Sequence, residues 1–212
     1  MHDWWQEERE AWETGYRCTA GIDEAGRGPL AGPVVAACVV LPFGKRPAGL
    51  NDSKQLTPRQ RDTLFDAVLG LARGYGLGIV SAPEIDRLNI LRATHLAMRL
   101  ALEGLPPGLR PDLVLIDGLP VRPFPVDQVA LVKGDARSAS IAAASILAKV
   151  TRDRLMCEYD ALYPAYGFAG HKGYGVASHL RALAEHGPCP LHRRSFRPVA
   201  EALRARPPHD GN

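Results

Sequence analysis

The segment Gly21–Pro33, with the sequence GIDEAGRGPLAGP, constrains the fold more than any other part of this 212-residue chain. It connects two apolar runs that we predict to be strands, Arg17–Asp23 and Val34–Leu41. The second run is apolar at almost every position, which is typical of a strand buried at the centre of a sheet. The sequence therefore predicts a fold that begins with two neighbouring strands joined by a glycine-rich turn.

Helices alternate with strands after this opening pair. Further strands are predicted at residues 75–80, 112–117 and 128–133, and helices from residue 57, from 81 to about 103, over 138–162, over 178–185 and over 198–205. Adjacent strands followed by alternating helices and strands predict one α/β domain, a mixed sheet with helices packed on it. The acidic, tryptophan-bearing start of the chain predicts a peripheral amphipathic helix.

Composition and charge limit the class of protein. The chain is 46% hydrophobic and 23% charged, a globular mix, and its formal net charge of +3 says little about partners. The stretch His171–Arg197 is locally basic, which indicates a phosphate-binding face only if a metal site lies beside it. Four cysteines without Cys-x-x-Cys spacing argue against zinc and disulfides and favour a cytoplasmic location. We expect no signal peptide and no membrane-spanning segment.

Four acidic residues stand at the ends of predicted elements. Asp23 and Glu24 follow the first strand, Asp117 ends an interior strand, and Asp135 precedes the helix that begins near Ser138. Catalytic groups collect at strand ends and helix starts of open α/β sheets, so these acids are expected to converge. Each of them alone could instead be a turn former or a helix cap, and Asp135 is a fair candidate for a cap.

The acids predict metal-dependent phosphodiester chemistry. Ligation by carboxylates alone favours Mg²⁺ or Mn²⁺ over zinc, and crowded carboxylates raise their own pKa values unless cations neutralise them. Two cations about 4 Å apart can activate the attacking water and stabilise the leaving oxygen. A serine nucleophile has little support because no Gly-x-Ser-x-Gly elbow is present, and the glycine-rich turn is not a Walker A loop.

Basic and aromatic side chains supply candidates for substrate contacts. The candidate phosphate contacts are Lys54, Lys133, Lys149, Arg152, His171 and Lys172. Lys149 and Arg152 share one helix face, where Lys149 can also pair with Asp153, so a solvated helix side is an equally good interpretation. Tyr174 lies between two glycines and is expected to be exposed, where an aromatic ring can stack on a base or a sugar.

Taken in order, these segments resemble the ribonuclease HII family, the bacterial type 2 ribonucleases H. The resemblance extends over nearly all of residues 21–199. It rests on the opening segment together with NDSKQL at 51–56, IDG at 116–118, KGD at 133–135, IAAASILAKVTRD at 141–153, YGFAGHKGY at 166–174 and HRRSF at 192–196. Each motif alone is weak, but the whole set in this order is highly specific.

The resemblance implies a ribonuclease H-like fold: a mixed β-sheet flanked by helices, with a small C-terminal helical extension. It implies an endoribonuclease that hydrolyses the RNA strand of RNA–DNA hybrids and removes ribonucleotides from DNA. Such an enzyme cuts 5′ of single ribonucleotides embedded in duplex DNA and leaves 3′-hydroxyl and 5′-phosphate ends. The expected cofactors are two divalent ions, Mn²⁺ or Mg²⁺, that bind with the substrate.

The resemblance also implies roles for individual residues. The four acids Asp23, Glu24, Asp117 and Asp135 fall on the catalytic, metal-binding positions of the family. Gly26, Arg27 and Gly28 fall on the backbone motif that senses the 2′-hydroxyl, and Tyr174 falls on the tyrosine that packs against the neighbouring deoxyribose. This division is physically sound because the 2′-hydroxyl is the group that distinguishes RNA from DNA at a given position.

The resemblance divides the chain into four parts. These are a peripheral segment at 1–16, a ribonuclease H-like catalytic core at 17–165, a substrate-contacting loop and helices at 166–206, and a frayed tail at 207–212. The tryptophan-bearing start belongs to no motif and receives no function. We expect a cytoplasmic monomer that binds RNA–DNA hybrids and ribonucleotide-containing duplex DNA, without a membrane or a protein partner.

Two other functions are compatible with parts of the pattern. A non-catalytic nucleic-acid binder could share the fold, but four carboxylates near phosphates would then bring no benefit. A different metal-dependent phosphoesterase, such as a DNA exonuclease, could carry a similar set of acids. Cleavage of an all-DNA duplex would distinguish the last alternative.

Overall fold

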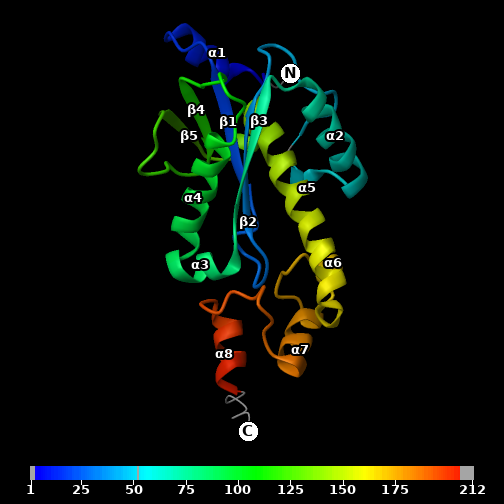
Figure 1. Ribbon diagram of the computed structural model, residues 1–212. Coiled ribbons are helices and arrows are strands. Elements are labelled where there is room, and N and C mark those ends of the chain that lie inside the picture. The colour runs from blue at the N-terminus through cyan, green and yellow to red at the C-terminus, as the bar shows by residue number, and fades with distance from the viewer. Residues whose placement is uncertain (1–2, 52, 206–212) are drawn as a thin grey trace.

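A five-stranded mixed sheet organises the fold (Figure 1). The computed structural model describes residues 3–51 and 53–205, so the tail at 207–212 lies outside the described residues. The strands are β1 (Thr19–Ala25), β2 (Val34–Val40), β3 (Gly74–Val80), β4 (Leu113–Asp117) and β5 (Asp127–Leu131), in the spatial order β3-β2-β1-β4-β5. β1, β2 and β3 pair antiparallel, and β4 and β5 continue the sheet parallel to β1.

Helices cover both faces of this sheet. The α-helices are α1 (Gln6–Glu13), α2 (Pro58–Leu71), α3 (Ala82–Leu88), α4 (Ile90–Glu103), α5 (Ala139–Leu162), α6 (Phe168–His171), α7 (Ala177–His186) and α8 (Arg197–Ala205). Short 3₁₀ turns lie at Ser53–Gln55, Gly134–Ala136 and Pro164–Tyr166. The mixed sheet with flanking helices confirms the predicted α/β fold class. No described helix is both long and apolar enough to cross a membrane.

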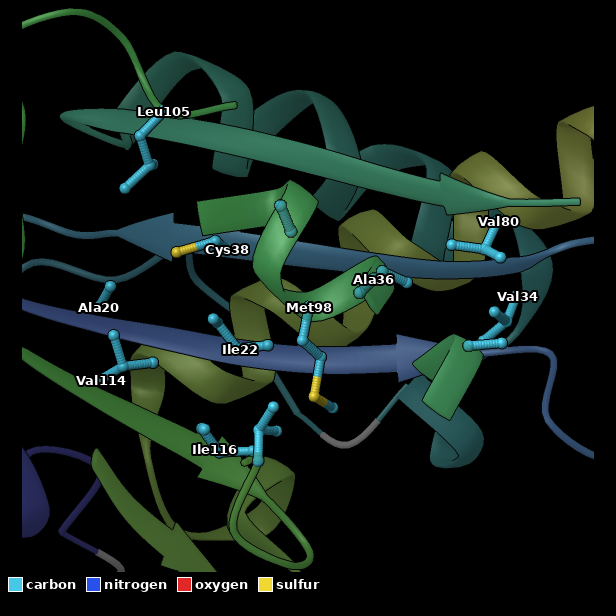
Figure 2. Packing of buried hydrophobic residues seen from close by; sticks show 14 of the residues in the cluster. Ala20, Ile22, Val34, Ala36, Cys38, Val80, Met98, Leu105, Val114 and Ile116 are labelled. Carbon is cyan, nitrogen blue, oxygen red and sulfur yellow. The ribbon is translucent and has the colours of Figure 1, made fainter. Parts of the chain in front are cut away.

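Alternate residues of the central strands enter two different cores. Ala36 and Cys38 of β2 pack with α3 and α4, as the close-up in Figure 2 shows. Ala37 and Val39, the intervening residues, pack with α2 and α5 on the opposite face. A strand that is buried on both faces must be apolar at every position, which accounts for the continuous apolar run in the sequence.

The close packing of α5 on β1 depends on Gly21. A Cβ atom at this position would lie 2.1 Å from the carbonyl carbon of Ser140 in α5. We expect Gly21→Ala to lower the free energy of unfolding by about 3 kcal/mol, the upper end for an overpacked core. Gly70→Ala is the control: Gly70 is exposed in α2 with nothing within 4 Å of its added Cβ, so it should gain about 0.5–1 kcal/mol. Urea unfolding of both variants measures the two effects, and a fully stable Gly21→Ala protein would contradict this packing.

The element boundaries differ from the expected ones at three places. β1 continues to Ala25, so Asp23 and Glu24 lie within the strand and do not follow it. β5 ends at Leu131 because the chain turns there, and Lys133 adopts a left-handed conformation with φ of 56°. The glycine-punctuated segment 167–175 contains the short helix α6, which buries Phe168.

The C-terminal extension, defined here as residues 166–205, is tied to the turn between β1 and β2. Leu30 donates its N–H to the Gly173 carbonyl at 2.8 Å, and Gly32 donates to Leu191 at 2.9 Å. A β-bridge joins Ala31 to His192 between these two hydrogen bonds. Segments from opposite ends of the chain are therefore fixed side by side at the carboxyl end of β1, and they frame the site described next.

Candidate active site

A pocket of about 260 Å³, called the acidic pocket below, opens at the carboxyl ends of β1 and β4. Three of the four predicted acids, Asp23, Glu24 and Asp117, line this pocket. The Gly-Arg-Gly turn (residues 26–28) and Tyr174 also contribute to its wall, which Ser53, Lys54, Ser145, Lys149 and Arg152 complete. The structure thus brings together most of the residues that were selected from the sequence.

Asp23 is the most deeply buried of the pocket acids, with 5% of its surface exposed. Its Oδ1 accepts the N–H of Glu24 at 2.6 Å. Burial raises the pKa of the Asp23 carboxyl well above its usual range, and the charges of Glu24 and Asp117 raise it further. An ionised Asp23 is therefore costly unless a positive charge enters the pocket.

One carboxylate oxygen of Glu24 has a hydrogen-bond partner and the other has none. Arg27 Nη1 lies 3.2 Å from Glu24 Oε1. Oε2 is buried and has no hydrogen-bond partner. Burial raises the pKa of Glu24, although the charge of Arg27 opposes this shift. A buried, unpartnered carboxylate oxygen indicates a missing ligand at this position.

Asp117 and Asp135 form the other side of the acidic cluster. The Gly134 N–H donates to Asp117 Oδ1 at 2.7 Å, which fixes the end of β4 against the 3₁₀ turn that carries Asp135. Burial raises the pKa of Asp117, and the neighbouring charge of Asp135 raises it further. Asp135 is buried and pairs with Lys54 Nζ at 3.1 Å. The helix cap of α5 is Ser138, not Asp135, so capping does not account for Asp135.

The acids fit a hard divalent cation that also takes oxygen ligands from a substrate. Carboxylate oxygens are suitable ligands, Oε2 of Glu24 has no hydrogen-bond partner, and a positive charge in the pocket would favour the ionised forms of Asp23 and Glu24, whose pKa values burial raises. Among the residues that the structure describes, no group of three or more His, Cys, Asp or Glu side chains is arranged to hold a metal ion by itself.

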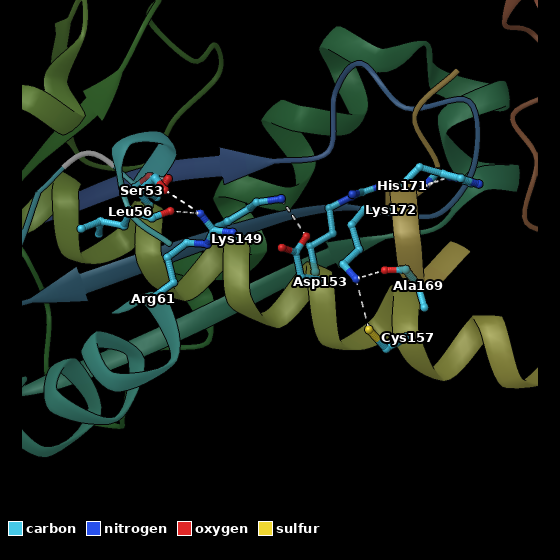
Figure 3. A network of polar contacts seen from close by, with 12 residues as sticks. Ser53, Leu56, Arg61, Lys149, Asp153, Cys157, Ala169, His171 and Lys172 are labelled. Carbon is cyan, nitrogen blue, oxygen red and sulfur yellow. Dashed lines mark hydrogen bonds and ion pairs between the residues drawn. The ribbon is translucent and has the colours of Figure 1, made fainter. Parts of the chain in front are cut away.

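The four lysines among the candidate phosphate contacts lie at different distances from the acidic pocket. Lys54 and Lys149 line the acidic pocket, and Lys149 also pairs with Asp153 at 2.8 Å (Figure 3). Lys172 lies in a neighbouring pocket of about 570 Å³, where its Nζ contacts the Ala169 carbonyl and Cys157 Sγ. Lys133 is exposed in the turn after β5 and is not part of the acidic pocket.

The side chains of Arg152 and His171 form hydrogen bonds with the protein backbone. Arg152 is 1% exposed, and its Nε and Nη2 donate to the carbonyls of Pro33 and Ala31 at 3.0 and 3.2 Å. His171 accepts the Gly173 N–H at Nδ1, so its Nε2 carries the hydrogen that bonds to the Tyr166 carbonyl at 2.9 Å. Both side chains are thus hydrogen-bonded to backbone groups of the protein, and Arg152 also lines the acidic pocket.

The Gly-Arg-Gly turn faces the ring of Tyr174. A Cβ atom added at Gly28 would lie 3.7 Å from Tyr174 Cε1, and Tyr174 is 46% exposed. Gly26 has a φ of 96°, which favours glycine. The exposed backbone of Arg27 and Gly28 and the exposed Tyr174 ring thus lie side by side in the wall of the acidic pocket, which is a suitable surface for a sugar.

Arg193 of the C-terminal extension stabilises this turn through hydrogen bonds to its backbone carbonyls. Its side chain is fully buried, and Nε, Nη1 and Nη2 donate to the carbonyls of Gly32, Arg27 and Gly26 at 3.0, 2.9 and 2.5 Å. Burial lowers the pKa of the Arg193 guanidinium to about 9, and the charge of Arg152 contributes to this shift. The planar fork of arginine suits such a set of carbonyl acceptors better than lysine would.

Two residues of this site, Arg193 and Ser145, were assigned no role from the sequence, in which they appear only as parts of motifs. The Ser145 hydroxyl lies 2.7 Å from the Ser53 hydroxyl in the wall of the acidic pocket. A hydrogen bond from Ser145 partly opposes the rise in the pKa of Asp23. No local signal could have identified these contacts, because their partners are distant in the sequence.

Comparisons with known proteins agree with this geometry. Residues 20–199 match the family model described as Ribonuclease HII. Ribonuclease HII of Geobacter sulfurreducens is 59% identical over 199 residues, which cover 94% of this chain and 91% of that protein. Ribonuclease HII of Syntrophotalea carbinolica is 59% identical over 189 residues, which cover 89% of this chain and 90% of that protein.

Solved structures show the same fold. Ribonuclease H2 from Pyrococcus horikoshii has a TM-score of 0.76 and 29% identity, and the match covers 89% of this chain and 98% of that chain. RNase HII from Archaeoglobus fulgidus, solved in complex with PCNA, has a TM-score of 0.70 and 25% identity over 85% of this chain and 96% of that chain. Bst-RNase HIII in complex with Mn²⁺ has a TM-score of 0.67 at 18% identity, over 92% of this chain and 72% of that chain, which shows likeness of fold alone.

Proposed function

The chain belongs to the ribonuclease HII family, and we propose that the acidic pocket is where it hydrolyses its substrate. It is an endoribonuclease that cleaves the RNA of RNA–DNA hybrids and cuts at ribonucleotides embedded in duplex DNA. The family depends on divalent metal ions. The observation that carries the proposal is the buried group Asp23, Glu24 and Asp117 opposite the Gly-Arg-Gly turn and Tyr174.

In this proposal the four acids Asp23, Glu24, Asp117 and Asp135 hold two divalent ions, Mg²⁺ or Mn²⁺, together with the scissile phosphate. Such ions activate a water molecule as the nucleophile and stabilise the leaving oxygen. The unpartnered Oε2 of Glu24 and the raised pKa of Asp23 support the assignment, since both features are relieved when positive charge enters the pocket.

The basic residues of the pocket act on the substrate phosphates. Lys54 pairs with Asp135 at 3.1 Å, and its side chain is 75% exposed. We propose that Lys54 turns from Asp135 to a phosphate once Asp135 serves as a ligand. Lys149, which also lines the pocket, contributes a second positive charge. Lys172 and Lys133, which lie farther out, are placed to contact the flanking nucleic-acid backbone.

The turn and the tyrosine select where the cut falls. The Gly-Arg-Gly turn senses the 2′-hydroxyl of the ribonucleotide, and Tyr174 packs against the adjacent deoxyribose. The adjacency of Gly28 and the Tyr174 ring in the pocket wall supports this division, because an uncovered backbone lies there next to an exposed ring. The phosphodiester bond 5′ of the selected ribonucleotide is then hydrolysed in the acidic pocket, which leaves a 3′-hydroxyl and a 5′-phosphate.

A duplex that carries one ribonucleotide tests the proposal. With Mg²⁺ or Mn²⁺ we expect a single cut 5′ of the ribonucleotide, cleavage of a uniform RNA–DNA hybrid and no cleavage of an all-DNA duplex. End analysis of the products checks the 3′-hydroxyl and the 5′-phosphate. Binding without cleavage in both metals would favour a non-catalytic binder, and degradation of the all-DNA duplex would favour a DNA exonuclease.

Location, oligomeric state and domain organisation complete the proposal. We propose that it acts as a cytoplasmic monomer whose partners are hybrids and ribonucleotide-containing duplexes. The division into a peripheral segment, a catalytic core and a substrate-contacting extension is proposed on the same basis. The packing of the extension against the turn supports it, since the extension also carries Tyr174.

A further inference from the structure

Two buried histidines and the half-buried His171 form a group next to Tyr174, and the proposed function uses none of them. His179 of α7 is fully buried and His192 is 2% exposed. The ring of His171 in α6 stacks on that of His179 with 4.5 Å between their centroids. The rings of His179 and His192 are joined by a hydrogen bond of 3.0 Å between their Nε2 atoms.

The contacts of His179 and His192 determine where their hydrogens lie. The backbone N–H of Cys189 donates to His192 Nδ1 at 3.0 Å, so this neutral ring carries its hydrogen on Nε2. His192 Nε2 therefore donates to Nε2 of His179. His179 then carries its hydrogen on Nδ1, which lies 2.9 Å from the Tyr174 carbonyl oxygen. The result is a relay of hydrogen bonds that runs in one direction and ends on Tyr174.

We propose that this two-histidine relay is a positioning device that sets the selectivity of the enzyme for the junction between a ribonucleotide and a deoxyribonucleotide. His179 and His192 touch no substrate in this proposal. They act through the backbone of Tyr174, whose ring packs on the deoxyribose. The inference rests on the proposed function, in which Tyr174 and the Gly-Arg-Gly turn together sense the junction.

The backbone around Tyr174 shows why such a device is needed. Lys172 and Gly173, which precede the tyrosine, both have positive φ, with values of 52° and 83°. The Tyr174 N–H donates to the His171 carbonyl at 2.9 Å, and its carbonyl accepts from His179 on the other side. A strained loop of this kind keeps one conformation only when its surroundings fix it.

One short segment links the relay to the other sugar sensor. His192 begins the relay, and the next residue, Arg193, donates to the carbonyls of Gly26 and Arg27. The segment His192–Arg193 therefore contacts Tyr174 indirectly, through His179, and hydrogen-bonds to the Gly-Arg-Gly turn through Arg193. Since both sensors are attached to one anchor, their separation is fixed, and that separation decides whether a ribose and a deoxyribose fit side by side.

The surroundings keep both rings of the relay neutral. Burial lowers the pKa of His192 to about 4, with a contribution from His179. Burial also lowers the pKa of His179, and His171 adds to the shift. The other titratable groups against the relay are the Cys189 thiol, whose Sγ lies 3.2 Å from His192 Nδ1, and Tyr166, whose ring centroid lies 4.9 Å from that of His192. A neutral relay preserves the direction of its hydrogen bonds at neutral pH.

Two substitutions at His179 provide a matched test. The amide of Asn can occupy the place of Nδ1 and donate to the Tyr174 carbonyl, whereas the amide of Gln reaches the place of Nε2 and leaves that carbonyl without its donor. The measured quantity is kcat/KM on a duplex with one ribonucleotide divided by kcat/KM on a uniform RNA–DNA hybrid. This ratio does not depend on the fraction of folded enzyme, so a merely structural loss would leave it unchanged.

His179→Gln is expected to lower this ratio about tenfold, since small misplacements at a reacting site are costly, and His179→Asn should stay near the wild-type ratio. His192→Asn keeps the acceptor for Cys189 but loses the donor that holds the hydrogen of His179 on Nδ1, so it should lower the ratio as His179→Gln does, even if the latter folds poorly. His179→Asn needs no such donor, because its amide N–H donates to the Tyr174 carbonyl directly. Wild-type ratios in all three variants, or equal losses in both His179 variants, would overturn the inference. A wild-type enzyme that cuts neither substrate would overturn the proposed function, and the inference with it.

Discussion

Asp23→Asn is expected to lower turnover on a duplex with one ribonucleotide by about 10³-fold, with much less effect on substrate binding. Loss of a charged ligand removes several kcal/mol of charge stabilisation, and each 1.36 kcal/mol corresponds to a factor of ten in rate. Binding depends mainly on phosphate and sugar contacts outside this carboxylate. The same reasoning applies to Asp117→Asn, because Asp117 lines the same pocket.

The same substitution is expected to stabilise the protein when no divalent ion is added. Asn can still accept the Glu24 N–H, which bonds to Asp23 Oδ1 at 2.6 Å, and it removes a charge from a buried cluster. Because burial raises the pKa of Asp23 in the folded protein, the folded state binds more protons than the unfolded state above about pH 4. Wild-type stability should therefore fall as the pH rises from about 4 through the raised pKa, and this fall should be smaller in Asp23→Asn.

Steady-state cleavage, substrate binding in Ca²⁺ and thermal unfolding across pH measure these effects. Asp62→Asn is the matched control, since Asp62 is exposed and pairs with Arg154 away from the acidic pocket. It should leave both turnover and the pH profile of stability unchanged. Near-normal turnover of Asp23→Asn would falsify the metal-binding role, and a lower melting temperature than wild type would contradict the electrostatic account.

The acids could be predicted from the sequence because their signal is local. Asp23 and Glu24 follow an apolar run directly, and Asp117 ends another, so strand periodicity alone places them at one edge of a sheet. The apolar run of β2 likewise indicates a strand that is covered on both faces. These inferences needed no knowledge of which segments meet in space.

The residues that hold the site in shape could not be predicted in this way. Arg193 and Gly26, which it contacts, are 167 residues apart, and Ser53 and Ser145 are 92 residues apart. The same limit applies to the backbone contacts of Arg152. A charged residue is expected at the surface unless acceptors surround it, and the acceptors of Arg152 lie 119 and 121 residues away.

Gly26→Ala is expected to lose about 1–3 kcal/mol of stability and about 10²-fold in cleavage at a single ribonucleotide. Gly26 has a φ of 96°, which strains any residue with a Cβ atom. That atom would also lie 2.0 Å from Arg152 Nε and 2.7 Å from the Pro33 carbonyl oxygen. Since the second contact is with backbone, the turn itself must move, and the carbonyls that Arg193 holds must move with it.

Gly28→Ala separates the sensing role of the turn from its folding role. Its Cβ atom would meet only the Tyr174 ring, at the ordinary contact distance of 3.7 Å, so unfolding should change by less than about 0.5 kcal/mol. The methyl group nevertheless covers the backbone surface on which we place the sugar, and one additional carbon in a fitted pocket costs about tenfold or more. Urea unfolding and cleavage of the one-ribonucleotide duplex measure both variants. A stable Gly28→Ala enzyme with wild-type cleavage would show that the sugar does not contact this part of the turn, whereas a stable Gly26→Ala enzyme would contradict the packing of Arg152 against the turn.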